Sequence, residues 1–292
     1  MELYLECYPC LVNQALKTSK LLGMNKNETK AAVDHVMKLL LDDHTGMTAP
    51  HIVAHLYRFI RSELYGGEAS FDPYREIKRE TNRKALSYFK HLTGMVERSS
   101  LPLQTAVKVA AAGNIIDFGV KAHGDIDIDH EINNIDNLAF NIFDFSDLKD
   151  RLKTAHNLLY IGDNAGEIVF DRVLIAEIKK EYPGIDVFFA VREKPVINDV
   201  TREDAELTGM HNDARVISSG SMYPGTVLPE TSTEFQRLFG TADVIIAKGQ
   251  GNYETLSDVE KNDLFFLLRI KCDIVAEKIN ASTGSLVLWK QN

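Results

Sequence analysis

The spacing of apolar positions divides the chain near residue 150 into two parts. In the first part apolar side chains recur every three to four residues, as they do along one face of an amphipathic α-helix. Pro50, Pro73 and Pro102 are expected in the first turns of successive helices, because proline is favoured there. The clearest apolar series is Val33, Val36, Met37, Leu40 and Leu41.

From about residue 155 onward, short runs rich in β-branched and aromatic residues alternate with helical stretches. Continuous apolar strands separated by helices are typical of a mainly parallel sheet that is covered on both faces. The sequence therefore predicts an α/β protein, with an all-helical N-terminal domain over residues 1–150 and a Rossmann-like α/β/α domain over residues 151–292. The expected strands are 158–161, 187–191, 215–217, 244–247, 264–268 and 286–289.

Charge and composition narrow the range of partners. The formal net charge is −9, from 42 acidic and 33 basic residues, which argues against a surface that binds a nucleic-acid backbone. No apolar run reaches the roughly 18–20 residues that a membrane helix needs, and the start of the chain is acidic where a signal peptide is basic. Three cysteines do not make a disulfide framework. We therefore expect a cytoplasmic protein with no nucleic-acid or membrane partner, whose oligomeric state the sequence does not define.

Polar residues follow the expected strands directly. Ligands of open α/β sheets bind beyond the carboxyl ends of the strands, so these loops are the candidate site. Asp163, Asn164 and Asp199 lie there, and their oxygen atoms suit a hard divalent cation such as Mg²⁺ or Mn²⁺. Lys248 follows another strand and could neutralise a phosphate. This combination indicates phosphate chemistry with a bound cation.

Several of these residues have simpler interpretations. Asp163 and Asn164 are residue types that favour turns and helix N-caps, and Glu167 could be a favourable acid in a first helical turn. Taken alone, the turn interpretation of Asp163 and Asn164 would be preferred. The metal interpretation is favoured because Asp199 and Lys248 are expected at neighbouring strand ends.

The same loops resemble the signatures of the DUF89, or damage-control phosphatase, family. The strongest runs are Gly-Asp-Asn-Ala-Gly-Glu at 162–167, Asn-Asp-Val-Thr at 198–201 and Lys-Gly-Gln-Gly-Asn-Tyr-Glu at 248–254. Weaker matches are Asp-Pro-Tyr at 72–74, Gly-Asn-Ile-Ile-Asp at 113–117 and Cys-Tyr-Pro-Cys at 7–10. The resemblance covers nearly the whole chain. The early Cys-x-x-Cys motif resembles that of the prokaryotic members of the family rather than the plant and animal members.

The resemblance implies a metal-dependent phosphatase that hydrolyses small phosphorylated metabolites, sugar phosphates among them, in a damage-control role. The cofactor would be a divalent cation (Mg, Mn, Co or Ni) held by Asp163, Asn164 and Asp199, with Lys248 near the phosphate. Whether a metal-bound water or the Asp163 carboxylate attacks stays open. The expected catalytic residues are Asp163, Lys248, Asn114 and Asp117.

Further residues are expected to contact the substrate phosphate. Gly249 and Gly251 would let backbone N–H groups approach its oxygens, and Ser219 and Gly220 follow the third expected strand. The complete expected phosphate-binding set is Glu167, Ser219, Gly220, Lys248, Gly249, Gly251 and Asn252.

Two other functions compete with the phosphatase. An S-adenosylmethionine-dependent methyltransferase would use the glycines at 162 and 166, with Glu193 on a ribose, but Lys248 would have no role. A non-catalytic metal or redox sensor would use Cys7 and Cys10 as a second metal site or a redox pair. With only Cys272 remaining, a zinc site of four cysteines is excluded.

Overall fold

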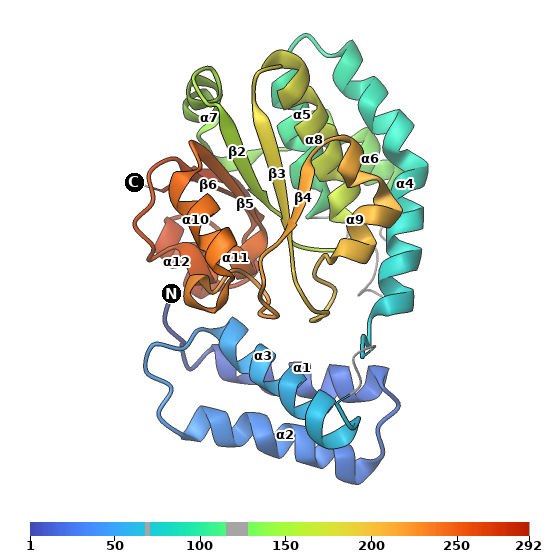
Figure 1. Ribbon diagram of the computed structural model, residues 1–292, viewed down its shortest axis with the longest axis vertical. Helices are drawn as coiled ribbons and strands as arrows, with labels where there is room; N and C mark the ends of the chain where they lie inside the picture. Colours follow the sequence, from blue (N-terminus) through green and yellow to red (C-terminus); the bar gives the residue numbers. More distant parts are fainter. Residues whose placement is uncertain (68–70, 115–127, 292) are drawn as a thin grey trace.

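The computed structural model describes residues 1–67, 71–114 and 128–291. These residues contain a seven-stranded sheet of order β1-β7-β6-β5-β2-β3-β4 (Figure 1). Strands β2 to β6 run parallel, so their carboxyl ends share one edge of the sheet. Strand β7 is antiparallel to β6, and β1 pairs with β7 in parallel. The strands are β1 (Phe140–Phe143), β2 (Asn157–Ile161), β3 (Asp186–Val191), β4 (Arg215–Ser218), β5 (Val244–Lys248), β6 (Leu264–Arg269) and β7 (Leu286–Lys290).

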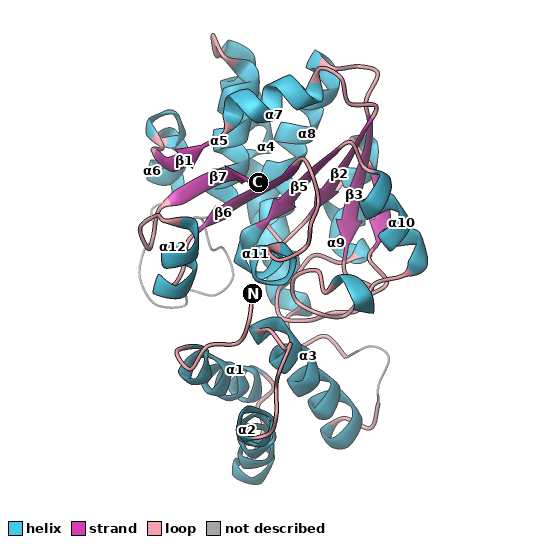
Figure 2. Ribbon diagram, turned by 90° about the vertical axis from the view of Figure 1, so that its left-hand side faces the viewer, coloured by secondary structure: helices cyan, strands magenta, loops and turns pink. Residues whose placement is uncertain are grey.

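Helices cover both faces of the sheet, and Figure 2 shows it between α4 and α8 on one side and α11 and α12 on the other. Successive residues of a strand point to opposite faces, so Leu158 and Tyr160 join one core while Leu159 and Ile161 join the other. The first face carries α4 (Arg75–Arg98), α5 (Pro102–Gly113), α7 (Phe145–Leu152), α8 (Glu167–Glu181) and α9 (Arg202–Thr208); the second carries α10 (Thr233–Thr241), α11 (Gly249–Leu256) and α12 (Asp273–Ile279). The short helices are α6 (Ile128–Asn133) and the 3₁₀ turns Ile135–Asn137, Met210–Asn212 and Leu228–Glu230.

The first helices form a helical cap (residues 1–64), and Phe71, Tyr74 and Val196 complete its apolar core. Asn25 and Glu28 form a capping box at the start of α2, which satisfies backbone N–H groups that the helix leaves free. Figure 1 shows the cap beyond the carboxyl ends of the parallel strands, and Ile77 at the start of α4 packs against the cap core. Its elements are α1 (Cys7–Leu21), α2 (Lys26–Leu41), α3 (Ala49–Phe59) and the π-helix Ile60–Leu64.

The predicted α/β class and mainly parallel sheet are confirmed, and all six expected strands are present. The expected all-helical domain over residues 1–150 needs correction, because β1 lies within it and pairs with β7. Helix α5 and most of α4 also pack in the core of the sheet, and only the first turn of α4 packs against the cap. The chain thus leaves the cap within the first turn of α4, since Phe71, Tyr74 and Ile77 still pack in the cap core, long before residue 150. Strand β1 was missed because Phe140–Phe143 is too short to show alternation.

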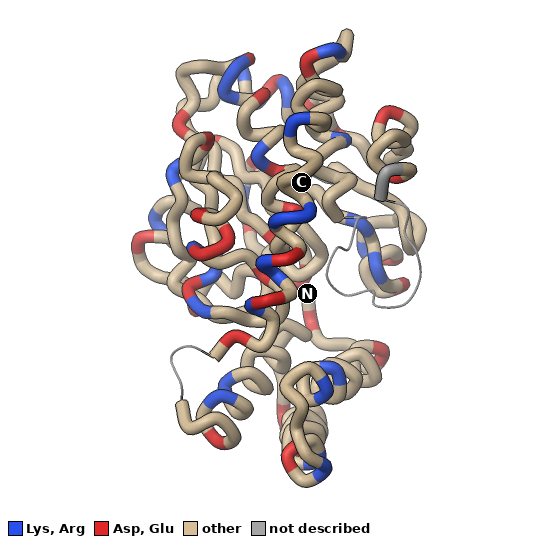
Figure 3. Tube along the Cα trace, turned by 90° about the vertical axis from the view of Figure 1, so that its right-hand side faces the viewer, with Lys and Arg blue, Asp and Glu red and all other residues tan. Residues whose placement is uncertain are grey.

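No described helix combines the length and the apolarity that crossing a membrane requires. Lysine and arginine are interspersed with aspartate and glutamate along the trace in Figure 3.

Candidate functional site

A pocket of 720 Å³ opens at the shared carboxyl edge of the parallel strands. The helical cap contributes Gln14 and Lys17 of α1 to its wall, and the loop after β6 contributes Lys271. The sheet and its helices therefore form one side of the pocket and the cap forms part of the other. Of the residues expected from sequence, the pocket lining includes Asn114, Asp163, Asn164, Glu167, Asp199 and Gly251.

Backbone hydrogen bonds join the loop after β2 to the loop after β3. Val200 donates its N–H to the carbonyl of Asp163 at 2.9 Å, and Ala165 donates to the carbonyl of Asn198 at 2.9 Å. A β-bridge pairs Asn164 with Asp199. These contacts bring the three expected metal ligands together, as the adjacency of β2 and β3 requires.

The carboxylates of this group are buried and repel one another. Asp163 is 7% exposed and Asp199 is 4% exposed. Burial, followed by the charges of Glu167 and Asp199, raises the pKa of Asp163 well above its ordinary value. Burial also raises the pKa of Asp199, against the opposing effect of Arg192. A cation between these oxygens would relieve both the repulsion and the cost of burial.

The donor atoms suit a hard cation. The Nδ2 of Asn164 donates to Asp163 Oδ2 and to Glu167 Oε1, both at 2.8 Å. The Asn164 Oδ1 accepts no hydrogen bond from any described residue and remains available beside the two aspartates. Within the described ranges no three His, Cys, Asp or Glu side chains already surround a common metal position. The expected set of two carboxylates and one amide oxygen is of the type that Mg²⁺ and Mn²⁺ accept together with water.

Arg192 is a residue of the site that the sequence analysis gave no role. It is 1% exposed, and its Nε donates to Asp199 Oδ2 at 2.8 Å. Its other nitrogens donate to Thr226 Oγ1 and Asn252 Oδ1, both at 3.2 Å. Arg192 thus fixes the orientation of Asp199. The sequence signal was its position directly after β3.

Asn252, which the sequence analysis expected to contact phosphate, is buried and forms hydrogen bonds with neighbouring residues of the site. Its Nδ2 donates to the carbonyls of Lys248 and Gly162, at 2.6 and 3.3 Å. Its Oδ1 accepts a hydrogen bond from Arg192. The side chain is fully buried and does not line the pocket. Asn252 therefore supports the site from beneath.

Lys248 also lies under the pocket rather than in its wall. It is fully buried, and its Nζ donates to Asp171 Oδ1 at 2.7 Å, Glu167 Oε2 at 3.4 Å and the Ala110 carbonyl at 2.9 Å. Although burial alone would lower it, the carboxylates of Asp171 and Glu167 raise the pKa of Lys248, which keeps it protonated. All three ammonium hydrogens have acceptors within the protein. In this arrangement Lys248 has no hydrogen left to donate to a substrate phosphate, which is the contact expected from the sequence.

Asp171 is the second residue that the sequence analysis missed. It accepts hydrogen bonds from Lys248 at 2.7 Å and from Tyr160 Oη at 2.7 Å. Burial, opposed by the Lys248 charge, raises the pKa of Asp171 to about 6. Its position four residues after Glu167, on the same face of α8, was the available signal.

Glu167 and Asn114 connect this buried group to the pocket. Asn114 ends α5, and its Nδ2 donates to Glu167 Oε2 at 2.6 Å. Its Oδ1 accepts the backbone N–H of Arg269 at 2.9 Å. Glu167 is the first residue of α8, where a negative charge is favoured. Asp117, the other expected catalytic residue of this segment, lies outside the described residues.

Gly249 is required by the close approach of the backbone to Asp163. It has a φ of +78°, and a Cβ at this position would overlap the Asp163 carboxylate. Gly251 lines the pocket against Gly225. Gly249 therefore permits the tight contact between α11 and the loop after β2.

We expect Gly249→Ala to lower kcat/KM for phosphate ester hydrolysis at least tenfold, since a loss of about 1.4 kcal/mol of transition-state stabilisation has that effect. The added methyl group would displace Asp163, and the positive φ would be strained in alanine. Gly240→Ala is the matched control, because a Cβ there meets nothing within 4 Å. Steady-state kinetics of both variants make the comparison, and equal activity of Gly249→Ala and wild type would contradict the placement of Asp163.

Comparison with known proteins identifies the family. Residues 3–287 match the damage-control phosphatase ARMT1-like domain. The chain belongs to this family. A damage-control phosphatase of Pyrococcus horikoshii is 35% identical over 291 residues, which span 99% of this chain and 98% of that protein. A damage-control phosphatase of Archaeoglobus fulgidus is 32% identical over 286 residues, 96% of each chain. The crystal structure of a DUF89 family protein of Pyrococcus horikoshii has a TM-score of 0.86 and 34% identity, with complete coverage of both chains.

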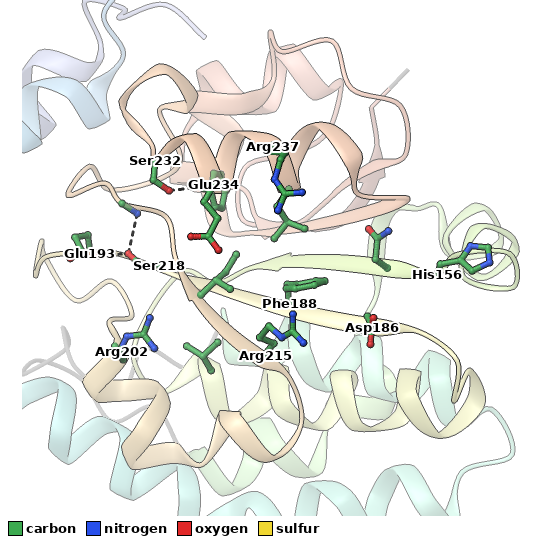
Figure 4. Close-up of a pocket in the computed structure, with 16 residues that line it drawn as sticks. His156, Asp186, Phe188, Glu193, Arg202, Arg215, Ser218, Ser232, Glu234 and Arg237 are labelled. Atoms are coloured by element: carbon green, nitrogen blue, oxygen red, sulfur yellow. Dashed lines mark hydrogen bonds between the residues drawn. The ribbon is translucent and has the colours of Figure 1, made fainter.

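The predicted resemblance to the damage-control phosphatases is thus confirmed. Two other expected phosphate contacts lie apart from the main pocket of this family member. Ser219 is fully buried. Gly220 lines a second pocket beside β4 and α10, where its N–H donates to Ser218 Oγ at 3.0 Å (Figure 4). Ser218 in turn donates to Glu193. Neither Ser219 nor Gly220 is brought to the Asp163 carboxylate.

The cysteines of this damage-control phosphatase homologue are all free thiols. Cys7 is partly exposed and Cys10 is exposed. Burial raises the pKa of the Cys7 thiol, with smaller contributions from Glu254, Cys272 and Cys10, which disfavours the reactive thiolate. A metal or redox role for Cys7 and Cys10, and membership of a subgroup defined by this pair, stay predictions.

Proposed function

We propose that this protein is a divalent-metal-dependent phosphatase of small phosphorylated metabolites. The observation that carries the proposal is that Asp163, Asn164 and Asp199 line the same pocket. Backbone pairing joins the two loops that carry the buried carboxylates. The names of the relatives at 32–35% identity support phosphatase activity and a damage-control role.

The charges around the site support a cation of two positive charges. Asp163, Glu167, Asp171 and Asp199 are buried carboxylates, and Lys248 and Arg192 are the buried cations paired with them. When all are ionised, this group carries two negative charges in excess. A buried excess of that size is costly, and one divalent cation would balance it.

The chain's own residues would hold the reacting groups in place. A cation bound by Asp163, Asn164 and Asp199 would polarise a phosphoryl oxygen and stabilise the charge of the transition state. Arg192 fixes the Asp199 carboxylate, and Glu167 and Asp163 together fix the Asn164 amide. Lys248 and Asn114 hold Glu167 at the pocket wall. Positioning of this kind reduces the reorganisation needed on the way to the transition state.

Removal of metal tests the proposal. We expect protein treated with chelator to lose hydrolysis of p-nitrophenyl phosphate and of a panel of sugar phosphates, and to regain it when Mg²⁺, Mn²⁺, Co²⁺ or Ni²⁺ is added singly. The reason is that the buried carboxylates alone would repel a phosphate dianion. Turnover at the full rate in metal-free protein would contradict the proposal.

The methyltransferase alternative loses its main support in the structure. Glu193, which would hold the ribose, bonds to Ser218 at the second pocket and does not line the pocket that contains Asp163. Titration of the protein with S-adenosylmethionine separates the two functions. Saturable binding without phosphatase activity under any metal condition would favour the methyltransferase.

A further inference from the structure

Large apolar side chains are concentrated on the outer surface of the helical cap. Helices α1 and α2 form an antiparallel hairpin: residues 22–25 join them, and the Oη of Tyr8 donates to the carbonyl of Leu40 at 3.1 Å. Among the described residues, the exposed large hydrophobic side chains outside this hairpin are Leu101 and Leu207. Those on it or directly before it are Leu5, Leu16, Leu21, Met37 and Leu41. A single exposed leucine is ordinary, whereas a group of this kind marks a surface that another molecule covers.

A groove of 520 Å³ lies between the two helices. It is lined by Tyr8, Pro9, Val12, Asn13 and Leu16 of α1 and by Met37, Leu40 and Leu41 of α2. None of these lining residues is charged, and all of them belong to the hairpin. Figures 1 and 2 show α2 on the side of the cap that is away from the sheet. The groove is therefore available to a second molecule.

The two halves of the hairpin carry opposite charge. The half that contains the start of α1 and the end of α2 has Glu2, Glu6, Asp34, Asp42 and Asp43 against Lys38. The other half has Lys17, Lys20, Lys26 and Lys30 against Glu28. The side chains of the first half thus have a net charge of −4 and those of the second half +3. A partner that covers the whole face must present both signs of charge in the reverse order.

A second copy of the hairpin meets this requirement in one of two symmetric arrangements. A two-fold axis parallel to the helices would place acidic half over acidic half. A two-fold axis perpendicular to the helices would place the acidic half of each copy over the basic half of the other. Complementary charges favour the second arrangement. Its four helices, packed around an apolar seam, form an antiparallel four-helix bundle.

We propose that the protein forms a homodimer through this hairpin, with α1 of one copy antiparallel to α1 of the other. The interface would bury Leu16, Met37 and Leu41 of both copies. A purely acidic partner or an anionic membrane would match the basic half alone, and a second copy matches both halves. No residue lines both the groove and the pocket that contains Asp163, so dimer formation does not require that pocket to close.

Sedimentation velocity of the full chain over a wide range of protein concentration tests the proposal. We expect a reversible dimer in the wild type and at least about a tenfold higher dissociation constant in Leu41→Gln. A two-fold interface loses the burial of this side chain twice, which accounts for the size of the effect. Leu41 is 80% exposed in the single chain, so its replacement should not disturb folding. Leu101→Gln is the matched control, because Leu101 is 58% exposed and lies outside the hairpin.

Charge reversal tests the antiparallel arrangement separately. The double variant Asp42→Lys with Asp43→Lys should weaken the dimer, and so should Lys20→Glu with Lys30→Glu. A chain that carries all four reversals should regain most of the affinity, because each half again faces its opposite. In the alternative arrangement like halves face one another, so neither double variant would lose affinity in this way.

The outcomes decide for or against the dimer without any substrate, so they are independent of the proposed phosphatase. A wild type that stays monomeric at every concentration would overturn the inference. Co-sedimentation of that monomer with vesicles of anionic phospholipid would assign the face to a membrane surface instead. A dimer that Leu41→Gln and Met37→Gln leave unchanged, with both variants folded by circular dichroism, would also overturn it.

Discussion

Replacement of Asp199 by asparagine is expected to lower kcat for phosphate ester hydrolysis on the order of 10³-fold, the scale on which a single transition-state contact acts in an enclosed site. The substitution removes one charge from the expected metal ligands and leaves the shape of the side chain almost unchanged. It also leaves the buried Arg192 without the carboxylate that it contacts at 2.8 Å. Initial rates over a range of Mn²⁺ concentrations measure the loss and show whether excess metal restores activity.

Asp186→Asn is the matched control for this substitution. Asp186 begins β3, the strand that leads to Arg192, but it is exposed and lies outside the pocket lining. Its variant should keep wild-type rates at every metal concentration. An Asp199→Asn variant that is folded and retains activity within tenfold of wild type would exclude Asp199 from the metal site.

Lys248→Met should destabilise the metal-free protein by about 3–5 kcal/mol, the usual cost of removing one partner from a buried ion pair. The Lys248 ammonium is the buried cation that contacts both Glu167 and Asp171, at 3.4 and 2.7 Å. Without it, two buried carboxylates would lose their compensating charge, and Asp171 already has an Oδ2 without a hydrogen bond. Urea unfolding followed by circular dichroism measures the change in the free energy of unfolding.

The double variant Lys248→Met with Asp171→Asn distinguishes charge from packing. If the loss arises from an uncompensated carboxylate, the double variant should be more stable than Lys248→Met alone, because residues in one buried network do not act additively. A Lys248→Met protein of wild-type stability and increased KM would instead place Lys248 against the substrate phosphate.

Much of the fold, and the meeting of Asp163, Asn164 and Asp199 in one pocket, could be predicted from the sequence, because both follow from strand order. Asp163 and Asp199 each follow a strand, and β2 and β3 proved to be neighbours in the sheet. Parallel neighbours present their carboxyl ends at the same edge, so residues 36 positions apart meet there. The β-bridge between Asn164 and Asp199 forms because the loops after β2 and β3 lie side by side at this edge.

Lys248 lies under the pocket and not in its lining, because the side chain of a strand residue points to one face of the sheet. Val244 and Ile246 of β5 join the core beneath α5 and α8, whereas Ile245 and Ala247 join the opposite core. Lys248 continues the series of alternate residues that faces α8, so its side chain turns under the pocket. Counting the alternation along β5 would have predicted this orientation, but not the acceptors, since Asp171 and Ala110 belong to other elements.

The cap side of the pocket was beyond sequence reasoning. Nothing in the spacing of α1 indicates that Lys17 lines the same pocket as the loop after β6, because its position there depends on how the cap packs beyond the sheet edge. Lys271 could have been predicted as a pocket residue from the sequence, since it lies two residues beyond the end of β6.

Equilibrium binding of Mn²⁺, followed by electron paramagnetic resonance of the free ion, tests the central claim most directly because it does not require the substrate to be known. The account predicts one saturable Mn²⁺ site per chain in the wild type, retained in Asp186→Asn and lost or strongly weakened in Asp199→Asn. Binding of equal strength in wild type and Asp199→Asn, or no Mn²⁺ binding in a protein that still hydrolyses phosphate esters after chelation, would contradict it.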